Sequence, residues 1–174
     1  MKTLLMTFAL FAVSSIASAT NYTFKQSQFN LKGTIKNATT NTTTPIFNLN
    51  GTAMWTEDAD DTYGSPKAQI TIRRTTYDCD DVNYSYDDDY SCEIQGAKFQ
   101  QILDDLVTHD DDFTTAQGII KRYFDDAAYY ESVKIPLGKL DQVGETTDSK
   151  ELTDPDNQNM SVDVEMSTTG MHPL

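Results

Sequence analysis

The chain contains only two cysteines, Cys79 and Cys92, so an internal disulfide can have only one pairing. Such a bridge would close a ring whose stabilisation is on the order of 3 kcal/mol in the chain-entropy model. The surrounding segment, residues 77–93, carries seven carboxylates and four tyrosines, and it has no lysine or arginine. The sequence therefore predicts a compact, strongly negative loop joining a β-rich first half to a more helical second half. Two separate thiols are the alternative.

The first residues have the pattern of a secretory signal peptide. Lys2 is followed by an apolar run from Leu4 to Val13, and Ala17-Ser18-Ala19 is the small-x-small pattern that signal peptidases accept. No stretch approaches the ~18 consecutive apolar residues that a stable membrane span needs. We therefore predict that residues 1–19 are removed and that the protein is secreted or periplasmic, where a disulfide persists. A buried N-terminal helix is the alternative.

Charge limits the classes of partner. The chain has 13 Lys and Arg against 27 Asp and Glu, a formal net charge of −14. Such a charge repels nucleic acid and anionic membranes, so we expect no nucleic acid among the partners and no membrane insertion. It is compatible with a divalent cation, with a basic protein surface, or simply with a solvated acidic surface.

Apolar and polar residues alternate through much of the chain, which is the period of half-buried strands. A change of phase at residues 26–28 indicates a β-bulge or a break between two strands. Strands are predicted over residues 21–35, 47–55, 67–77, 90–95, 129–137 and 160–166, and loops over 37–45, 57–66 and 141–159. The first two strands should form a hairpin with a long tip, and residues 90–95 would place the disulfide at the mouth of a second hairpin. Pro136 should lie at a sheet edge or strand end.

Two helices are predicted between these strands. Phe99, Ile102, Leu103 and Leu106 follow the i, i+3, i+4, i+7 spacing of one helix face, and that helix should end by His109. A second helical pattern follows three consecutive aspartates, with Asp112 as its candidate N-cap. The apolar positions of this second pattern are Ala116, Ile119, Ile120, Tyr123 and Phe124.

These elements predict one α+β domain over residues 20–166, with a disordered tail at 167–174. Its sheet should be mainly antiparallel, with about five or six strands and both helices packed on one face. A β-sandwich or barrel with the helical segment as an insertion is the alternative. The predicted core combines apolar side chains from strands and helices: Phe47, Leu49, Trp55, Ile70, Ile72, Phe99, Leu103, Leu106, Ile120, Phe124, Val133 and Ile135.

The acidic loop is the candidate binding site. Calcium binds several oxygen ligands, which this loop can offer from both flanks, although its spacing matches no known calcium loop. Its tyrosines can supply contact area to a protein partner, while the carboxylates steer a basic surface towards it. The candidate metal ligands are Asp80, Asp81, Asp87, Asp88 and Asp89, and the candidate contact residues are Tyr84, Tyr86 and Tyr90.

Three further motifs have ordinary explanations. Residues 154–165 place acids at positions 1, 3 and 12 of an EF-hand loop, but they lack its turn glycine and exiting helix, so we interpret the similarity as accidental. His109 beside Asp110 resembles a base with an orienting acid, and it equally fits a surface histidine in a turn. Six Asn-x-Ser/Thr sequons are glycan acceptors only in a eukaryotic secretory pathway: Asn21, Asn37, Asn41, Asn50, Asn83 and Asn159.

The sequence contains no nucleophile elbow, P-loop, dinucleotide fingerprint or zinc-ligand cluster. The first functional hypothesis is therefore an exported, non-enzymatic binding module that uses the acidic loop. A second is an extracellular or periplasmic hydrolase that depends on carboxylates, which requires a cleft with a carboxyl of raised pKa. A third is a structural surface protein with no ligand.

Overall fold

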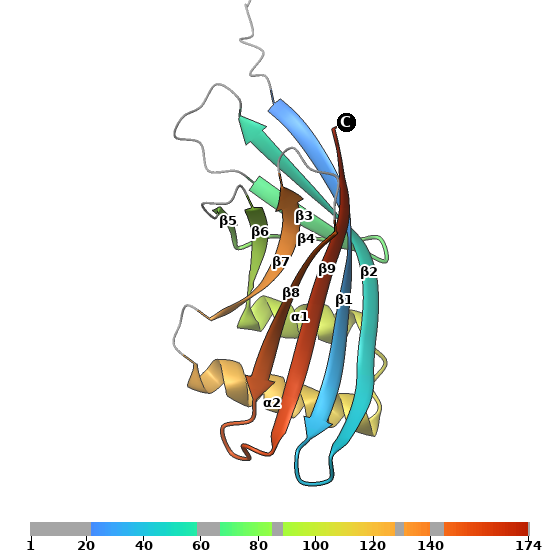
Figure 1. Ribbon diagram of the computed structural model, residues 1–174, viewed down its shortest axis with the longest axis vertical. Helices are drawn as coiled ribbons and strands as arrows, with labels where there is room; N and C mark the ends of the chain where they lie inside the picture. The colour runs from blue at the N-terminus through green and yellow to red at the C-terminus, as the bar shows by residue number, and fades with distance from the viewer. Residues whose placement is uncertain (1–21, 59–66, 85–88, 128–130, 140–144, 174) are drawn as a thin grey trace, which may run out of the picture.

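A computed structural model describes residues 22–58, 67–84, 89–127, 131–139 and 145–173 (Figure 1). The described part is an α+β structure of antiparallel strands and two helices, as the sequence predicts. The elements, in chain order, are β1 (Tyr22–Asn37), β2 (Thr42–Asp58), β3 (Lys67–Ile72), β4 (Thr75–Asp78), β5 (Asp81–Tyr84), β6 (Asp89–Gln95), α1 (Gly96–Leu106), α2 (Asp111–Asp126), β7 (Ser132–Lys139), β8 (Glu145–Thr153) and β9 (Met160–Pro173).

The strands form two sheets. Sheet A has six strands in the order β4-β3-β2-β1-β9-β8, and sheet B has three in the order β5-β6-β7. The helices are inserted between β6 and β7, which pair with each other directly. Figure 1 shows both helices and sheet B on the same side of the long, curved sheet A. The core lies between these layers.

The hairpin of β1 and β2 is the longest element of sheet A. Its ladder runs from Tyr22↔Asp58 to Asn37↔Thr42, so most of the predicted loop at residues 37–45 is strand and the tip is short. Asn41 takes a positive φ of 53° in this tip, a conformation that asparagine tolerates well. The predicted irregularity is present as a register shift against β9 between Ser27 and Gln28, while β1 itself continues.

The predicted third strand, residues 67–77, is two strands joined by a tight turn. Arg73 and Arg74 form this turn with φ values of 49° and 80°, a region that arginine rarely adopts. Arg73 Nη1 donates a hydrogen bond to the carbonyl of Leu106, the last residue of α1, at 2.6 Å. A cation is favourable at a helix C-terminus, so the turn is fixed by a contact distant in sequence.

The N-cap of α2 is Asp110, and the prediction of Asp112 was wrong. The Asp110 carboxylate accepts a hydrogen bond from the Phe113 backbone N–H at 2.7 Å. Asp111 and Asp112 lie in the first turn instead, where negative charge is favourable for the helix dipole.

Two predictions for the C-terminal region were also wrong. Residues 145–153, within the predicted loop at 141–159, form β8 at the edge of sheet A. The predicted disordered tail continues β9 as far as Pro173, which pairs with Lys25. Pro136 lies in β7, an edge strand of sheet B, as predicted.

The predicted core is correct except at one position, because Phe124 is only partly buried. Apolar residues at alternate positions of β1, β2 and β9 face the helices and sheet B. The largest additional buried side chains are Phe29, Leu31, Ile94, Ile102, Phe113 and Ile119.

Candidate functional site

The chain passes from sheet A to sheet B at the first cysteine of the acidic segment. The Cys79 N–H donates to the Ala68 carbonyl in β3 at 3.0 Å, whereas the Asp80 N–H donates to the Glu93 carbonyl in β6 at 2.8 Å. Cys79 forms the predicted disulfide with Cys92, with a Cα–Cα distance of 5.4 Å. Cys92 is fully buried in β6, opposite Val82 of β5. The disulfide therefore ties the crossover between the sheets to β6, just outside the β5–β6 hairpin.

Asp80 supports this crossover through contacts that sequence reasoning missed. Lys98 Nζ of α1 lies 2.5 Å from Asp80 Oδ1, and the Gln95 N–H donates to Asp80 Oδ2 at 2.8 Å. Lys98 also donates to the Asp78 carbonyl at 2.8 Å. Both Asp80 oxygens are thus engaged in holding α1 against the crossover. The only sequence signal was that Lys98 is the first base after the acidic segment.

The structure places the other candidate ligands in different surroundings. Asp81 is exposed, and its Oδ1 accepts a hydrogen bond from the N–H of Val82 at 2.8 Å. Tyr86, Asp87 and Asp88 lie outside the described residues, as do the side chains of Tyr84 and Asp89, whose backbones belong to β5 and β6. Within the described part of the chain, no three His, Cys, Asp or Glu side chains come close enough together to hold a metal ion.

Tyr90 belongs to the core. Only 9% of its surface is exposed, and its ring lies 4.5 Å from that of Trp55, measured between centroids. The aromatic pair links the loop end of the β5–β6 ladder, where Tyr90 pairs with Tyr84, to β2 in sheet A. Most of this ring is therefore unavailable for direct contact with a partner.

Next to the hairpin, Glu93 is held by neighbours from two strands. It accepts hydrogen bonds from Asn83 Nδ2 at 2.9 Å and pairs with Lys134 Nζ at 3.0 Å. Burial raises the pKa of Glu93, but the hydrogen bonds from Asn83 and Lys134 outweigh it and leave the pKa below its usual value. Asn83, one of the sequons, is thus part of a polar network on the outside of sheet B.

A cleft of about 270 Å³ opens beside this network, between sheet B and β8. Most of the residues that line it are polar, but apolar atoms make up the larger part of its exposed surface. The side chains that line it from sheet B are Asn83, Tyr90, Ser91, Lys134 and Pro136, and those from β8 are Thr146, Thr147 and Asp148.

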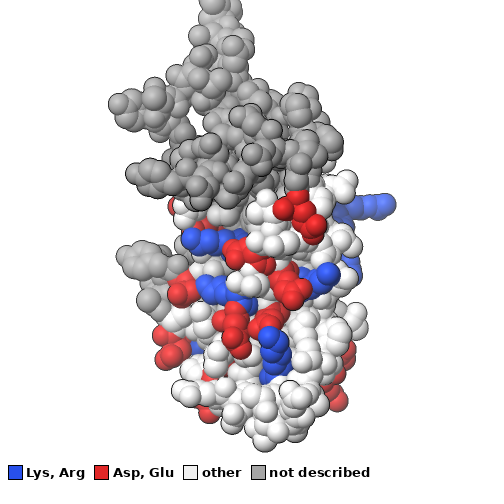
Figure 2. Space-filling view, in the orientation of Figure 1, with Lys and Arg blue, Asp and Glu red and all other residues white. Residues whose placement is uncertain are grey.

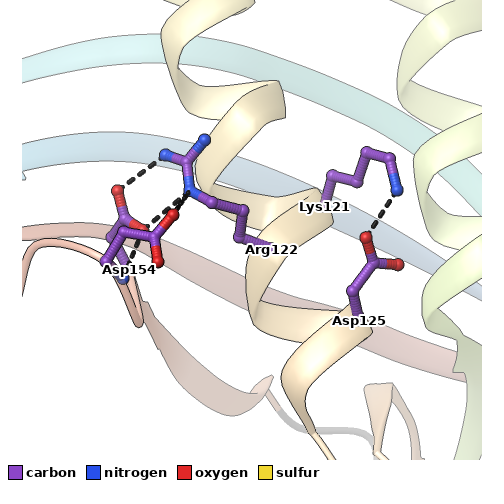
Figure 3. Close-up of polar contacts among 5 residues, drawn as sticks. Lys121, Arg122, Asp125 and Asp154 are labelled. Atoms are coloured by element: carbon purple, nitrogen blue, oxygen red, sulfur yellow. Dashed lines mark hydrogen bonds and ion pairs between the residues drawn. The ribbon is translucent and has the colours of Figure 1, made fainter.

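The most buried carboxylate among the described residues, Asp154, lies at the other end of β8 (Figure 3). Its oxygens accept hydrogen bonds from Arg122 Nε at 2.9 Å and Nη2 at 2.7 Å, which join α2 to the β8–β9 turn. These hydrogen bonds lower the pKa of Asp154 against the opposing effect of burial, with help from the Asp156 N–H. Asp154 is the first position of the EF-hand-like stretch, and both its oxygens are already engaged.

The groups that an acid–base hydrolase would use have other roles. The pKa of Asp154 and that of Glu93 are both lowered, whereas a general acid needs a raised one. Asp110 caps α2 and His109 packs on Phe113, with ring centroids 5.0 Å apart. These positions give no support to the pair of histidine and aspartate as a catalytic dyad.

Acidic and basic side chains alternate on the face shown in Figure 2. Further ion pairs of the described residues also connect strands or layers: Lys36 pairs with Asp163 between β1 and β9, and Lys150 of β8 pairs with Glu131 before β7. The excess acid of the chain is thus partly compensated in sheet A.

Comparison with known proteins gives no relative: no family model, curated protein or solved structure matches the chain. In the described part of the chain, neither helix has the length and apolar character needed to cross a membrane.

Proposed function

We propose that this chain is an exported, non-enzymatic binding module whose recognition element is the acidic β5–β6 hairpin. The observation that carries the proposal is the anchoring of the hairpin at both ends of its ladder. The disulfide fixes its second strand, the Asp80–Lys98 pair fixes its entry, and Tyr90 holds the start of β6, at the loop end of the ladder, against Trp55. A segment held in this way loses little conformational entropy on binding, which favours affinity.

A basic protein surface is the proposed partner. Asp80 is compensated by Lys98, so the remaining negative charge of the hairpin is that of Asp81 at its base and, in the sequence, of Asp87, Asp88 and Asp89. Carboxylates along a hairpin increase the association rate with a basic surface and set its orientation. Calcium would require several of these oxygens to converge on one point, and no contact among the described residues favours that arrangement.

Export completes the proposal. The N-terminal segment has the pattern of a signal peptide, and the disulfide is of the kind that persists in an oxidising compartment. The secreted or periplasmic location remains part of the proposal. It is tested by N-terminal sequencing of the mature protein, which should begin at Thr20.

The binding test uses an oligolysine peptide as the probe, with fluorescence anisotropy as the readout. Wild type is compared with a variant in which Asp87, Asp88 and Asp89 become asparagine. The matched control changes the same number of acids elsewhere: Asp105, Asp125 and Asp126 become asparagine. These control acids lie near helix C-termini, where negative charge is unfavourable. Their contacts are an exposed pair of Asp125 with Lys121 and a long hydrogen bond from the Tyr77 hydroxyl to Asp105, so the control should keep the native fold.

Binding that the hairpin variant loses and the control retains supports the proposal. Equal weakening in both variants would mean that net charge alone attracts the probe, and it would overturn the proposal. Thermal melts in EDTA, calcium and magnesium complete the test. A calcium-specific rise in Tm that disappears in the hairpin variant would assign a metal site in place of a protein partner.

A further inference from the structure

The free edge of sheet A at β8 has a defined hydrogen-bonding pattern. Among the strands that the structure describes, β8 pairs with β9 alone, in a register without shifts from Glu145↔Thr169 to Thr153↔Ser161. Just beyond it, the Asp154 N–H donates to the Met160 carbonyl at 2.9 Å. Hydrogen-bonded and non-hydrogen-bonded pairs alternate in an antiparallel ladder. Even-numbered residues of β8 therefore bond to β9, and the backbone groups of Thr147, Ser149 and Glu151 face the open edge.

Ser149 lies at the centre of this edge, and its N–H is occupied by the preceding side chain. The Ser149 N–H donates to Asp148 Oδ1 at 2.7 Å. The same contact occurs in β5, the edge strand of sheet B, where the Val82 N–H donates to Asp81 Oδ1. Charged side chains at sheet edges are a known means of preventing pairing with another strand.

The other edges are closed in further ways. Lys98 Nζ donates to the Asp78 carbonyl of β4, and Lys150 Nζ donates to the Ser132 carbonyl of β7, both at 2.8 Å. Thr168 Oγ1 donates to the carbonyl of Pro136, which itself has no N–H. β4 and β5 are only 4 residues long, whereas β8 has 9 residues. β7 has 8 residues, but its Ser132 and Pro136 carbonyls already accept side-chain hydrogen bonds, so β8 is the long edge strand better suited to pair with another strand.

The sequence of β8 is complementary to itself in the antiparallel orientation. If two copies met about a two-fold axis at Ser149, Asp148 would lie opposite Lys150 and Thr147 opposite Glu151. Glu145 would lie opposite Thr153, so no acid would face an acid. Opposite charges across a strand pair are favourable, and the same surface would serve in both copies.

We propose that β8 is a pairing edge for a second copy of this chain and that Asp148 keeps it closed. Opening releases the Ser149 N–H from the Asp148 carboxylate. The N–H then donates to the Ser149 carbonyl of the second copy, and Asp148 faces Lys150 of that copy. The occupant is a second copy because the strand is complementary to itself in charge and in edge pattern.

The test measures the dimer dissociation constant by sedimentation equilibrium for wild type, Asp148→Ala and Glu145→Ala. Asp148→Ala frees two symmetric N–H groups, one in each copy, and also removes the two exposed Asp148–Lys150 pairs, which are worth less than the hydrogen bonds gained. The dissociation constant should therefore fall about tenfold. Glu145→Ala removes the same charge from the same strand without freeing Ser149, and it should match wild type. An unchanged Asp148→Ala variant, or an equal effect in Glu145→Ala, would overturn the proposal.

A second variant tests whether the two copies meet at the Ser149 N–H. Asp148→Ala/Ser149→Pro lacks the N–H in question, and proline is tolerated where an edge N–H lies outside the ladder. This double variant should return to the wild-type dissociation constant while it keeps the native circular dichroism spectrum. If the proline unfolds the chain, hydrogen exchange of Asp148→Ala at low and high protein concentration shows instead whether the dimer forms through β8. Protection that rises with concentration within residues 145–153 supports the proposal, whereas a rise only elsewhere contradicts it.

Discussion

Removing the disulfide should destabilise the fold by an amount that its loop length sets. The bridge joins residues with a sequence separation of 13, and closing such a loop in the unfolded chain corresponds to about 3 kcal/mol. The change Cys79→Ala/Cys92→Ala removes this constraint, and it also removes a fully buried sulfur at position 92. In a chain of this size, a loss of about 3 kcal/mol lowers Tm by about 6–12 °C.

The assay is urea denaturation of the oxidised wild type and of the double alanine variant, followed by circular dichroism. A lower midpoint at an unchanged m-value is expected if the native state keeps its two sheets. Dithiothreitol should destabilise the wild type by a similar amount and leave the variant unchanged. A loss below about 1 kcal/mol would refute the reasoning, since it would mean that the Lys98 contacts and the β5–β6 ladder already fix the crossover without the bridge.

Three further changes test other parts of the structure. Asp154→Ala should cost about 2 kcal/mol because Arg122 loses a charged partner, and the deficit should be checked by chemical denaturation across pH. The pKa of folded Asp154 is lowered from its ordinary value of 3.8, so the ionised carboxylate contributes its full stabilisation above pH 3.8 and loses it as the pH falls through the folded pKa. A stability difference between wild type and Asp154→Ala that persists in strong acid would contradict this assignment. Ser27→Ala should leave the free energy of unfolding unchanged or raise it by about 1 kcal/mol, because the buried Ser27 hydroxyl has no hydrogen-bond partner among the described residues; a clear loss of stability would show that the hydroxyl is satisfied. Arg74→Gly should raise Tm because glycine adopts the φ of 80° without strain. Arg73→Gly should raise Tm by less because it also loses the hydrogen bond to the Leu106 carbonyl, and an equal rise in both variants would show that this hydrogen bond adds nothing to stability.

The candidate site was predictable in part. Cys79 and Cys92 were paired by elimination, because there was no third cysteine. The role of Asp80 was not predictable, since its partner Lys98 lies on a helix that only folding brings against the crossover. The burial of Tyr90 depends in the same way on Trp55, a residue far away in the sequence.

The missed elements share a physical cause. β8 has little apolar alternation, since Leu152 is its only fully buried apolar side chain and its inner positions include Asp148 and Lys150. An edge strand of this kind forms because its backbone hydrogen-bonds to β9, and local periodicity does not reveal that pairing. The turn at Arg73 and Arg74 contains no glycine, asparagine or proline, and it is fixed by the C-terminus of α1.

The sequence by itself determined the elements whose burial repeats with a fixed period, the two helices, and the pairing of the cysteines. Alternation decides which face of a strand meets the core, and it does so locally in the chain. Only the tertiary structure decided that the strands divide into two sheets at Cys79 and that β8 forms an edge. It also decided which of the many aspartates are engaged: Asp80 with Lys98, Asp154 with Arg122, and Asp148 with the N–H of Ser149. The composition gives the number of charged side chains, but the role of each one depends on which partners folding brings within hydrogen-bond distance.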